Sequence, residues 1–113
     1  MSAQLAIQFI RPQNGQILNN GQFLHVSAYV TLSCGAPTCA GGRYDASQFH
    51  VTAELFRDGL TAGAFDMSFT GDVSEFACDV PLNGPGRYEL VVSAIDMDSG
   101  MAGKARCGFG VRS

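Results

Sequence analysis

The most regular feature of the chain is an alternation of apolar and polar side chains. Between residues 23 and 32, in the stretch FLHVSAYVTL, every second residue is aliphatic and the residues between them are mostly polar. Successive side chains of a β-strand point to opposite faces, so this period of two predicts a strand with one buried face. The same period recurs along the chain and predicts strands at 5–9, 23–32, 49–55, 65–69, 76–82, 88–94 and 105–111.

Turn-forming residues separate these stretches at regular intervals. The segments NNG at 19–21, DG at 58–59 and NGPG at 83–86 supply the positive φ angles that tight hairpins need. No window of 11 residues shows apolar spacing of three and four, which would indicate an amphipathic helix. Short strands with glycine-rich turns therefore predict an all-β antiparallel sandwich or barrel with almost no helix.

Two segments resemble those of a known class of domain. IRPQNGQILNNGQFLHVSAYV at 10–30 and GPGRYELVVSAIDMDSG at 84–100 are similar to the first two strands and the penultimate strand of bacterial immunoglobulin-like and fibronectin type III-like domains. The resemblance implies an immunoglobulin-like β-sandwich of about seven strands, with Tyr88 as the tyrosine-corner residue. Leu90 stands where antibody domains carry their second cysteine, and the chain has no Trp, so an antigen-receptor domain is not expected.

Composition supports one folded domain over residues 1–113. With 46% hydrophobic and 15% charged residues, the sequence is unlike that of a disordered chain. The net charge of -3, with seven Lys and Arg spread singly, argues against nucleic acid as a partner. No apolar run approaches the roughly 18 to 20 residues that a membrane span needs, and residues 1–11 lack the pattern of a signal peptide. We therefore expect no membrane insertion.

The four cysteines predict disulfides if the protein is exported, because an even number in a small domain often forms a disulfide framework. The predicted bonds are Cys34 to Cys39, which enclose only four residues, and Cys78 to Cys107. Cys78 and Cys107 both fall on inward faces, and their bond would close a loop of roughly 30 residues. Buried free thiols and a zinc site are the alternatives, and the spacing supports zinc least. Cysteine content favours an extracellular or cell-surface location, whereas the missing signal peptide favours the cytosol.

No catalytic, cofactor-binding or metal-binding residue is predicted. Alternation points His25 and His50 outward on different strands, so they are not expected to share a site. The nucleophile-elbow, zinc-protease and phosphate-loop motifs are absent from the sequence. Asp96 and Asp98 could offer oxygens to calcium, but a D-x-D fragment supplies few of the six to eight that calcium takes, so a hairpin turn is expected there.

These observations predict a non-catalytic binding or structural module for protein–protein interaction or surface adhesion, with a protein or glycan partner. Arg43 and Tyr44, in the long segment 35–46, are the candidate contact residues, because both types contribute large contact energies. The alternatives are a carbohydrate-binding appendage and a small enzyme with a shallow cleft. Phe23, Tyr29 and Phe56 are the outward aromatic residues that could serve a glycan, or form the face of a homodimer.

Overall fold

The protein was studied as a computed structural model, which describes residues 5–19, 23–32, 48–72, 74–82, 84–98 and 100–112. The described residues contain no α-helix, and none of their segments is a helix able to cross a membrane. The strands are β1 (Leu5–Arg11), β2 (Ile17–Asn19), β3 (Phe23–Leu32), β4 (Phe49–Arg57), β5 (Leu60–Phe69), β6 (Glu75–Pro81), β7 (Gly86–Asp96) and β8 (Ala102–Arg112). All seven predicted strands are confirmed.

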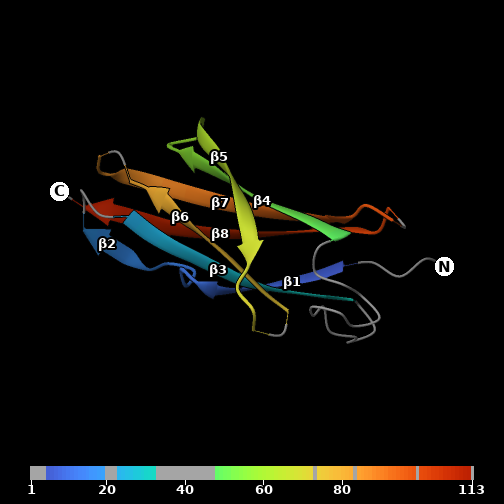
Figure 1. The fold of residues 1–113 in the computed structure, drawn as a ribbon. Helices are drawn as coiled ribbons and strands as arrows, with labels where there is room; N and C mark the ends of the chain where they lie inside the picture. The colour runs from blue at the N-terminus through green and yellow to red at the C-terminus, as the bar shows by residue number, and fades with distance from the viewer. Residues whose placement is uncertain are drawn as a thin grey trace.

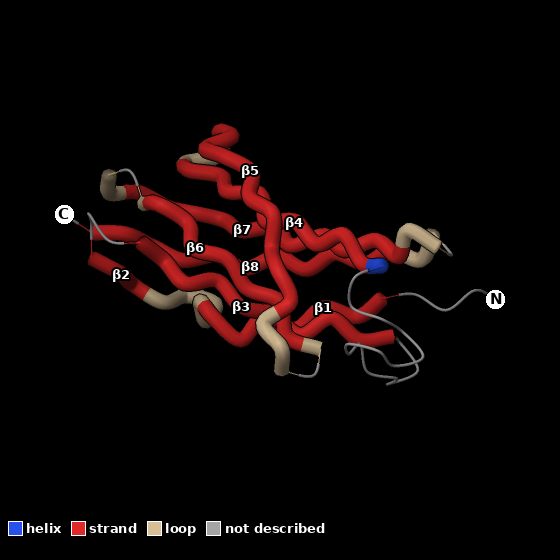
Figure 2. The backbone as a smooth tube through the Cα atoms, in the orientation of Figure 1, coloured by secondary structure: helices blue, strands red, loops and turns tan. Residues whose placement is uncertain are grey.

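The strands form two layers that face each other (Figure 1). β1, β3 and β6 make the first layer, and β4, β7, β8 and the short β2 make the second. β5 belongs to both, because its residues 60–67 pair with β4 and its residues 68–69 pair with β6. Figure 2 shows β5 crossing from one layer to the other. Every pair of neighbours is antiparallel except β2 and β8, which run parallel.

Alternation explains the core between the layers. The side chains that it places inward on the central strands are buried: Leu24, Val26, Ala28 and Val30 of β3, Phe49, Val51, Ala53 and Leu55 of β4, and Tyr88, Leu90, Val92 and Ala94 of β7. Many of them are β-branched or aromatic, types that fill the space between pleated surfaces well. Each fully buried Val, Leu or Phe side chain among them stabilises the fold by about 1.5–3 kcal/mol.

Alternation is wrong at Ser27 and Val91, which are buried although their positions predict exposure, whereas Asp96 is buried in phase with the inward residues of β7. Ser27 lies on β3, the middle strand of its layer, with paired strands on both sides. Val91 likewise lies on the outer face of β7, the middle strand of the second layer, and is only 7% exposed. Both residues therefore lie on strands that have paired neighbours on both sides.

β2 is the one strand in the described residues that alternation did not predict, because three residues are too few to show a period. It lies beside the end of β8, and two backbone hydrogen bonds precede it: the Gly15 amide donates to the Gly108 carbonyl at 2.7 Å, and the Gly110 amide donates to the Gln16 carbonyl at 2.9 Å. The pairing extends the second layer by one edge strand.

Candidate functional site

The outer face of the second layer carries a shallow groove across β4, β7 and β8, with a volume of about 490 Å³. Antiparallel pairing places Ile95 directly between His50 and Ala102, one residue from each strand. Residues aligned in this way point to the same face of a sheet. The groove is lined by His50, Thr52, Ser93, Ala94, Ile95, Ala102, Gly103 and Lys104.

The groove is hollow because short side chains lie among longer ones. Ser93 and Ala102 rise little above the sheet, whereas Lys104, which is aligned with Ser93, is a long side chain at the rim. The next row along the strands has Glu54 and Arg106 at its two ends. Since neither of these two residues lines the groove, this row marks where it stops.

The surface of the groove is mainly apolar, with basic groups at its rim. Ile95 is 44% exposed, which is unusual for an aliphatic residue at the centre of a three-strand row. Lys104 supplies an ammonium group, and His50 supplies an imidazole whose Nε2 lies 3.3 Å from the Asp66 carboxylate. Such a surface can accept an apolar side chain and place a neighbouring carboxylate against Lys104.

The two histidines lie where the sequence predicts, exposed and on opposite layers. His25 of β3 is directly opposite Asp79 of β6, and its Nδ1 lies 3.0 Å from the carboxylate. His50 belongs to β4 in the other layer and interacts with Asp66. Each histidine therefore has its own exposed partner. In the described part of the chain, no three His, Cys, Asp or Glu residues are grouped closely enough to hold a metal ion.

Asp96 organises the turn between β7 and β8. Its carboxylate oxygen Oδ1 accepts hydrogen bonds from the Asp98 amide at 2.9 Å and from the Gln48 side chain at 3.1 Å. The Gly100 amide in turn donates to the Asp96 carbonyl at 2.7 Å. An aspartate that bonds the backbone two residues ahead is a standard turn former. The hairpin turn expected at this place is confirmed. The buried Asp96 carboxylate stabilises this turn by accepting hydrogen bonds.

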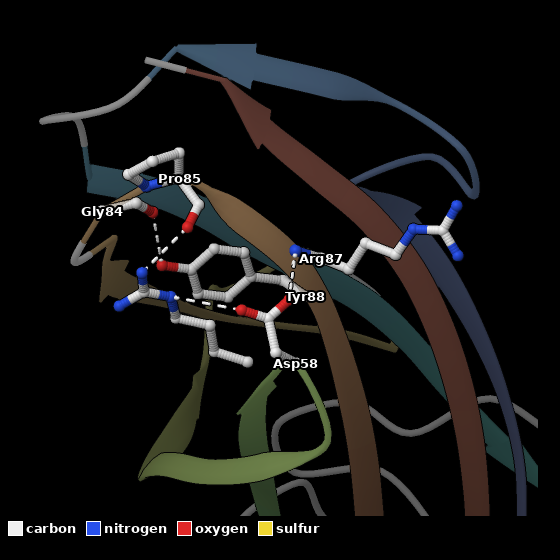
Figure 3. A network of polar contacts seen from close by, with 6 residues as sticks. Asp58, Gly84, Pro85, Arg87 and Tyr88 are labelled. Atoms are coloured by element: carbon white, nitrogen blue, oxygen red, sulfur yellow. Dashed lines mark hydrogen bonds and ion pairs between the residues drawn. The ribbon is translucent and has the colours of Figure 1, made fainter.

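Tyr88 makes the tyrosine-corner contact that the resemblance implies (Figure 3). Its buried hydroxyl donates a hydrogen bond of 2.8 Å to the carbonyl of Gly84, four residues earlier. Its ring stacks on Phe109 of β8, with 5.4 Å between the ring centres. The contact fixes the segment before β7 onto the core.

The β4–β5 hairpin is joined to the same segment. Asp58 and Gly59 both have positive φ angles, 50° and 84°, as an Asp-Gly hairpin turn requires. The Asp58 carboxylate accepts a hydrogen bond from the Arg87 amide at 3.0 Å (Figure 3). The Arg57 guanidinium donates one to the Pro85 carbonyl at 2.9 Å. These contacts join two loops at one end of the sandwich, and their role is structural.

The disulfide predicted between Cys78 and Cys107 is not formed, since both residues are free thiols. Cys78 lies on β6 between β3 and β5, whereas Cys107 lies on β8 in the other layer and donates a hydrogen bond to the Pro12 carbonyl at 3.3 Å. Facing layers lie about 10 Å apart, beyond the roughly 4.4–6.8 Å between Cα atoms that a disulfide spans. Both residues face inward as predicted, but from opposite sides of the core.

Burial keeps both thiols protonated. It raises the pKa of Cys78 to about 11, with a smaller contribution from the negative charge of Asp79, and it also raises the pKa of Cys107. Because the thiolate is the reactive form, neither residue is suited to nucleophilic chemistry at neutral pH.

The predicted aromatic face is wrong. Phe23 and Tyr29 are exposed on β3 in the first layer, whereas Phe56 lies on β4 in the second layer. Phe23 and Tyr29 are themselves about 20 Å apart along their strand at roughly 3.3 Å per residue. The three rings cannot form one platform for a glycan or one dimer face. The other predicted residues, Cys34, Cys39, Arg43 and Tyr44, lie outside the described residues.

Sequence reasoning missed the groove because it depends on the register of three strands. The period of two within the predicted strand 88–94 leaves Ser93 on the outward face, but it does not say which residues of β4 and β8 lie beside Ser93. The available signal was Ile95, an aliphatic residue directly after the predicted strand 88–94, where continued alternation would place it on the outward face.

The structure is similar to solved structures that include fibronectin type III-like modules. It superposes on part of an engineered protein with a TM-score of 0.72 and 13% sequence identity, over 97% of this chain and 20% of that chain. It also superposes on a structure of the fibronectin(III)-like modules of Clostridium thermocellum CbhA with a TM-score of 0.56 and 13% identity, over 94% of each chain. The fold is therefore an immunoglobulin-like, fibronectin type III-like β-sandwich.

These similarities concern the fold alone, because identity is low and the chain spans only a fifth of the engineered protein. No protein-family model matches the sequence, and no curated protein does.

Proposed function

We propose that this chain is a non-catalytic binding module that holds a segment of a partner protein in the groove on β4, β7 and β8. The observation that carries the proposal is the groove itself, an apolar hollow of about 490 Å³ on a sheet face that no other described strand covers. Its volume lies within the roughly 300–1,000 Å³ typical of binding sites. A sheet face without a binding role would be expected to carry polar residues at Ile95 and its neighbours.

The lining favours a peptide segment over a glycan. Glycan-binding surfaces on flat sheets usually present aromatic rings, and no Phe, Tyr or Trp lines this groove. Ile95 and Ala102 offer apolar contact area, and Lys104 offers a charge for one carboxylate. The preferred partner segment therefore has an apolar side chain next to an Asp or Glu.

Support for a non-catalytic role comes from the arrangement of the histidines and thiols. His25 and His50 lie on opposite layers, each beside an exposed aspartate, so they cannot act together on one substrate. Burial raises the pKa of both described cysteines, which makes them poor nucleophiles.

The proposal is tested by selecting binders from a displayed library of random peptides. The intact chain is expected to enrich peptides that combine an apolar residue with an acidic one. Ser93→Arg should abolish their binding, because an arginine at the groove floor fills the hollow and repels Lys104. Ala64→Arg is the matched control, since Ala64 is exposed on the neighbouring strand β5 and does not line the groove.

Equal binding of the peptides to Ser93→Arg and to the parent chain would contradict the proposal. A glycan array probed with the same three proteins separates the alternative. Glycan binding that is lost only in Ser93→Arg would assign the groove to a carbohydrate-binding appendage.

A further inference from the structure

Charge is segregated between the two long edges of the sandwich. The layers meet along β1 and β8 on one side and along β5 and β6 on the other. Residues 5–19 and 100–112, which include both strands of the first edge, contain no Asp or Glu, and their charged residues are Arg11, Lys104, Arg106 and Arg112. Residues 60–82, which include both strands of the second edge, contain no Lys, Arg or His, and their charged residues are Asp66, Asp72, Glu75 and Asp79.

One edge is therefore basic and the other acidic, although the whole chain has a net charge of only -3. The acidic groups are accessible: the Asp66 and Asp79 side chains are 84% and 70% exposed. On the basic edge, Arg106 lies 3.6 Å from Glu89 of its own chain, whereas Lys104 is exposed at the rim of the groove.

At both edges of the second layer, part of the backbone is not paired with another described strand. β8 pairs with β7 on one side, and on its other side the described strands pair only with residues 110–112. β5 pairs with β4 on one side, and on its other side only residues 68–69 pair with β6. Residues 104–106 of β8 and residues 60–67 of β5 are thus edge segments within the described fold, whereas β1 lies against β8 at Gly103. Open edges of this kind can pair with another chain.

The directions of the two edge strands suit each other. β5, β4, β7 and β8 are successively antiparallel, so β8 runs opposite to β5. When a second copy is placed beside the first by translation, β8 of one copy is antiparallel to β5 of the next. Antiparallel pairing then continues the sheet from one molecule to the next.

We propose that a second copy of this chain binds edge to edge, with the basic edge at β8 of one molecule against the acidic edge at β5 of the next. Lysine on an edge strand usually prevents such pairing, because it places a buried charge against the incoming strand. Here the incoming edge carries Asp66, which neutralises that charge. The contact is heterologous, so it uses two different surfaces of each molecule and can add further copies. It shares Lys104 with the rim of the groove, but it does not use the groove floor at Ser93 and Ile95, and the groove needs no second copy.

The test is the mass of the intact chain in solution by sedimentation equilibrium at low and high salt. Exposed charges are screened over about 10 Å at 0.1 M salt and about 3 Å at 1 M salt. We expect a mean mass above the 11.9 kDa of the monomer well below 0.1 M salt, and a return to that mass at 1 M salt. A mass of 11.9 kDa at both salt concentrations would overturn the proposal.

Charge-reversal variants locate the interface. Lys104→Glu and Asp66→Lys should each weaken association by on the order of tenfold, because each puts like charges in contact. Arg87→Glu and Glu54→Lys are the matched controls, since they make the same charge changes on the central strands β7 and β4. Equal weakening by variants and controls would mean that net charge alone governs association and would overturn the edge assignment.

Mixing the two edge variants is the most direct test of which edges meet. The Lys104→Glu protein keeps its acidic edge and the Asp66→Lys protein keeps its basic edge, so an equimolar mixture should associate again at low salt. Failure of the mixture, with both variants folded by circular dichroism, contradicts the proposal. Ser93→Arg keeps both Lys104 and Asp66, so it should still associate at low salt although it no longer binds the selected peptides, which separates this result from the outcome of the peptide test.

Discussion

At the scale of single residues, the Tyr88 hydroxyl is the clearest case of one polar atom holding a loop to the core. It is buried and donates to the Gly84 carbonyl. Removing it leaves that carbonyl without this donor, at a cost of about 1 kcal/mol or more.

We expect Tyr88→Phe to lower the free energy of unfolding by about 1–2 kcal/mol in a urea titration. Tyr29→Phe is the control, because Tyr29 is exposed and its hydroxyl remains hydrated, so its midpoint should stay the same. Equal midpoints for the parent chain and Tyr88→Phe would show that the corner hydrogen bond contributes nothing to stability.

Cys78 gives a prediction that depends on pH. Folding raises the pKa of its thiol from 9.0 to about 11, mainly through burial, so the folded state favours the neutral form. The contribution of the neutral Cys78 thiol to the free energy of unfolding is fully present below pH 9.0 and is lost as the pH rises towards about 11. Under reducing conditions the parent chain should therefore lose more stability across this pH range than Cys78→Ala does. The same loss in both proteins would refute the assignment.

At the scale of the elements, the close approach of β1 to β8 depends on Gly103. A Cβ at this position would collide with the carbonyl oxygen of Leu5, which belongs to the backbone and cannot turn away. Gly108, on the same strand, has room, because a Cβ at that position would lie 3.6 Å from its nearest neighbouring atom. The two glycines therefore form a matched pair.

We expect Gly103→Ala to lower the thermal midpoint and to cost about 1–3 kcal/mol, since β1 must shift to make space. Gly108→Ala should be neutral or slightly stabilising, because alanine restricts the unfolded chain more than glycine does. Calorimetry of the two variants decides the matter, and equal midpoints would count against a tight contact between β1 and β8.

The elements also show which parts of the fold the sequence can predict. Alternation located seven strands and most of the core, because each strand needs only its own residues to show a period of two. It missed β2, which is held by pairing with β8, and it misjudged Val91, which is buried by neighbours on other strands. Features that depend on pairing or packing with other strands could therefore not be predicted from one stretch of sequence.

The same reason explains the errors at the candidate sites. Cys78 and Cys107 face inward as predicted, but alternation does not say to which layer a strand belongs, and the two thiols lie on opposite layers. The predicted aromatic face failed for this reason as well. The groove around Ile95 and the charged edges became visible only when strand order and register were known.

At the scale of the whole molecule, the described strands leave the outer face of β4, β7 and β8 and the edge segments of β8 and β5 uncovered. The groove centred on Ile95 is proposed to bind a partner segment, and the edges at β8 and β5 are proposed to bind further copies of the chain. The loops at one end are instead joined to each other through Asp58 and Arg57. This arrangement assigns binding to strands, whereas the sequence alone assigned it to the segment with Arg43 and Tyr44.

The assignment of binding to the outer face of β4, β7 and β8 can be tested residue by residue in solution. The measurement is an amide chemical-shift titration of the ¹⁵N-labelled chain with a peptide selected from the random library. We expect the largest shifts to cluster at Thr52, Ser93, Ile95 and Lys104, and β3 of the other layer to be unaffected. Shifts concentrated on β3, or on residues 35–46 with the groove unchanged, would contradict the assignment.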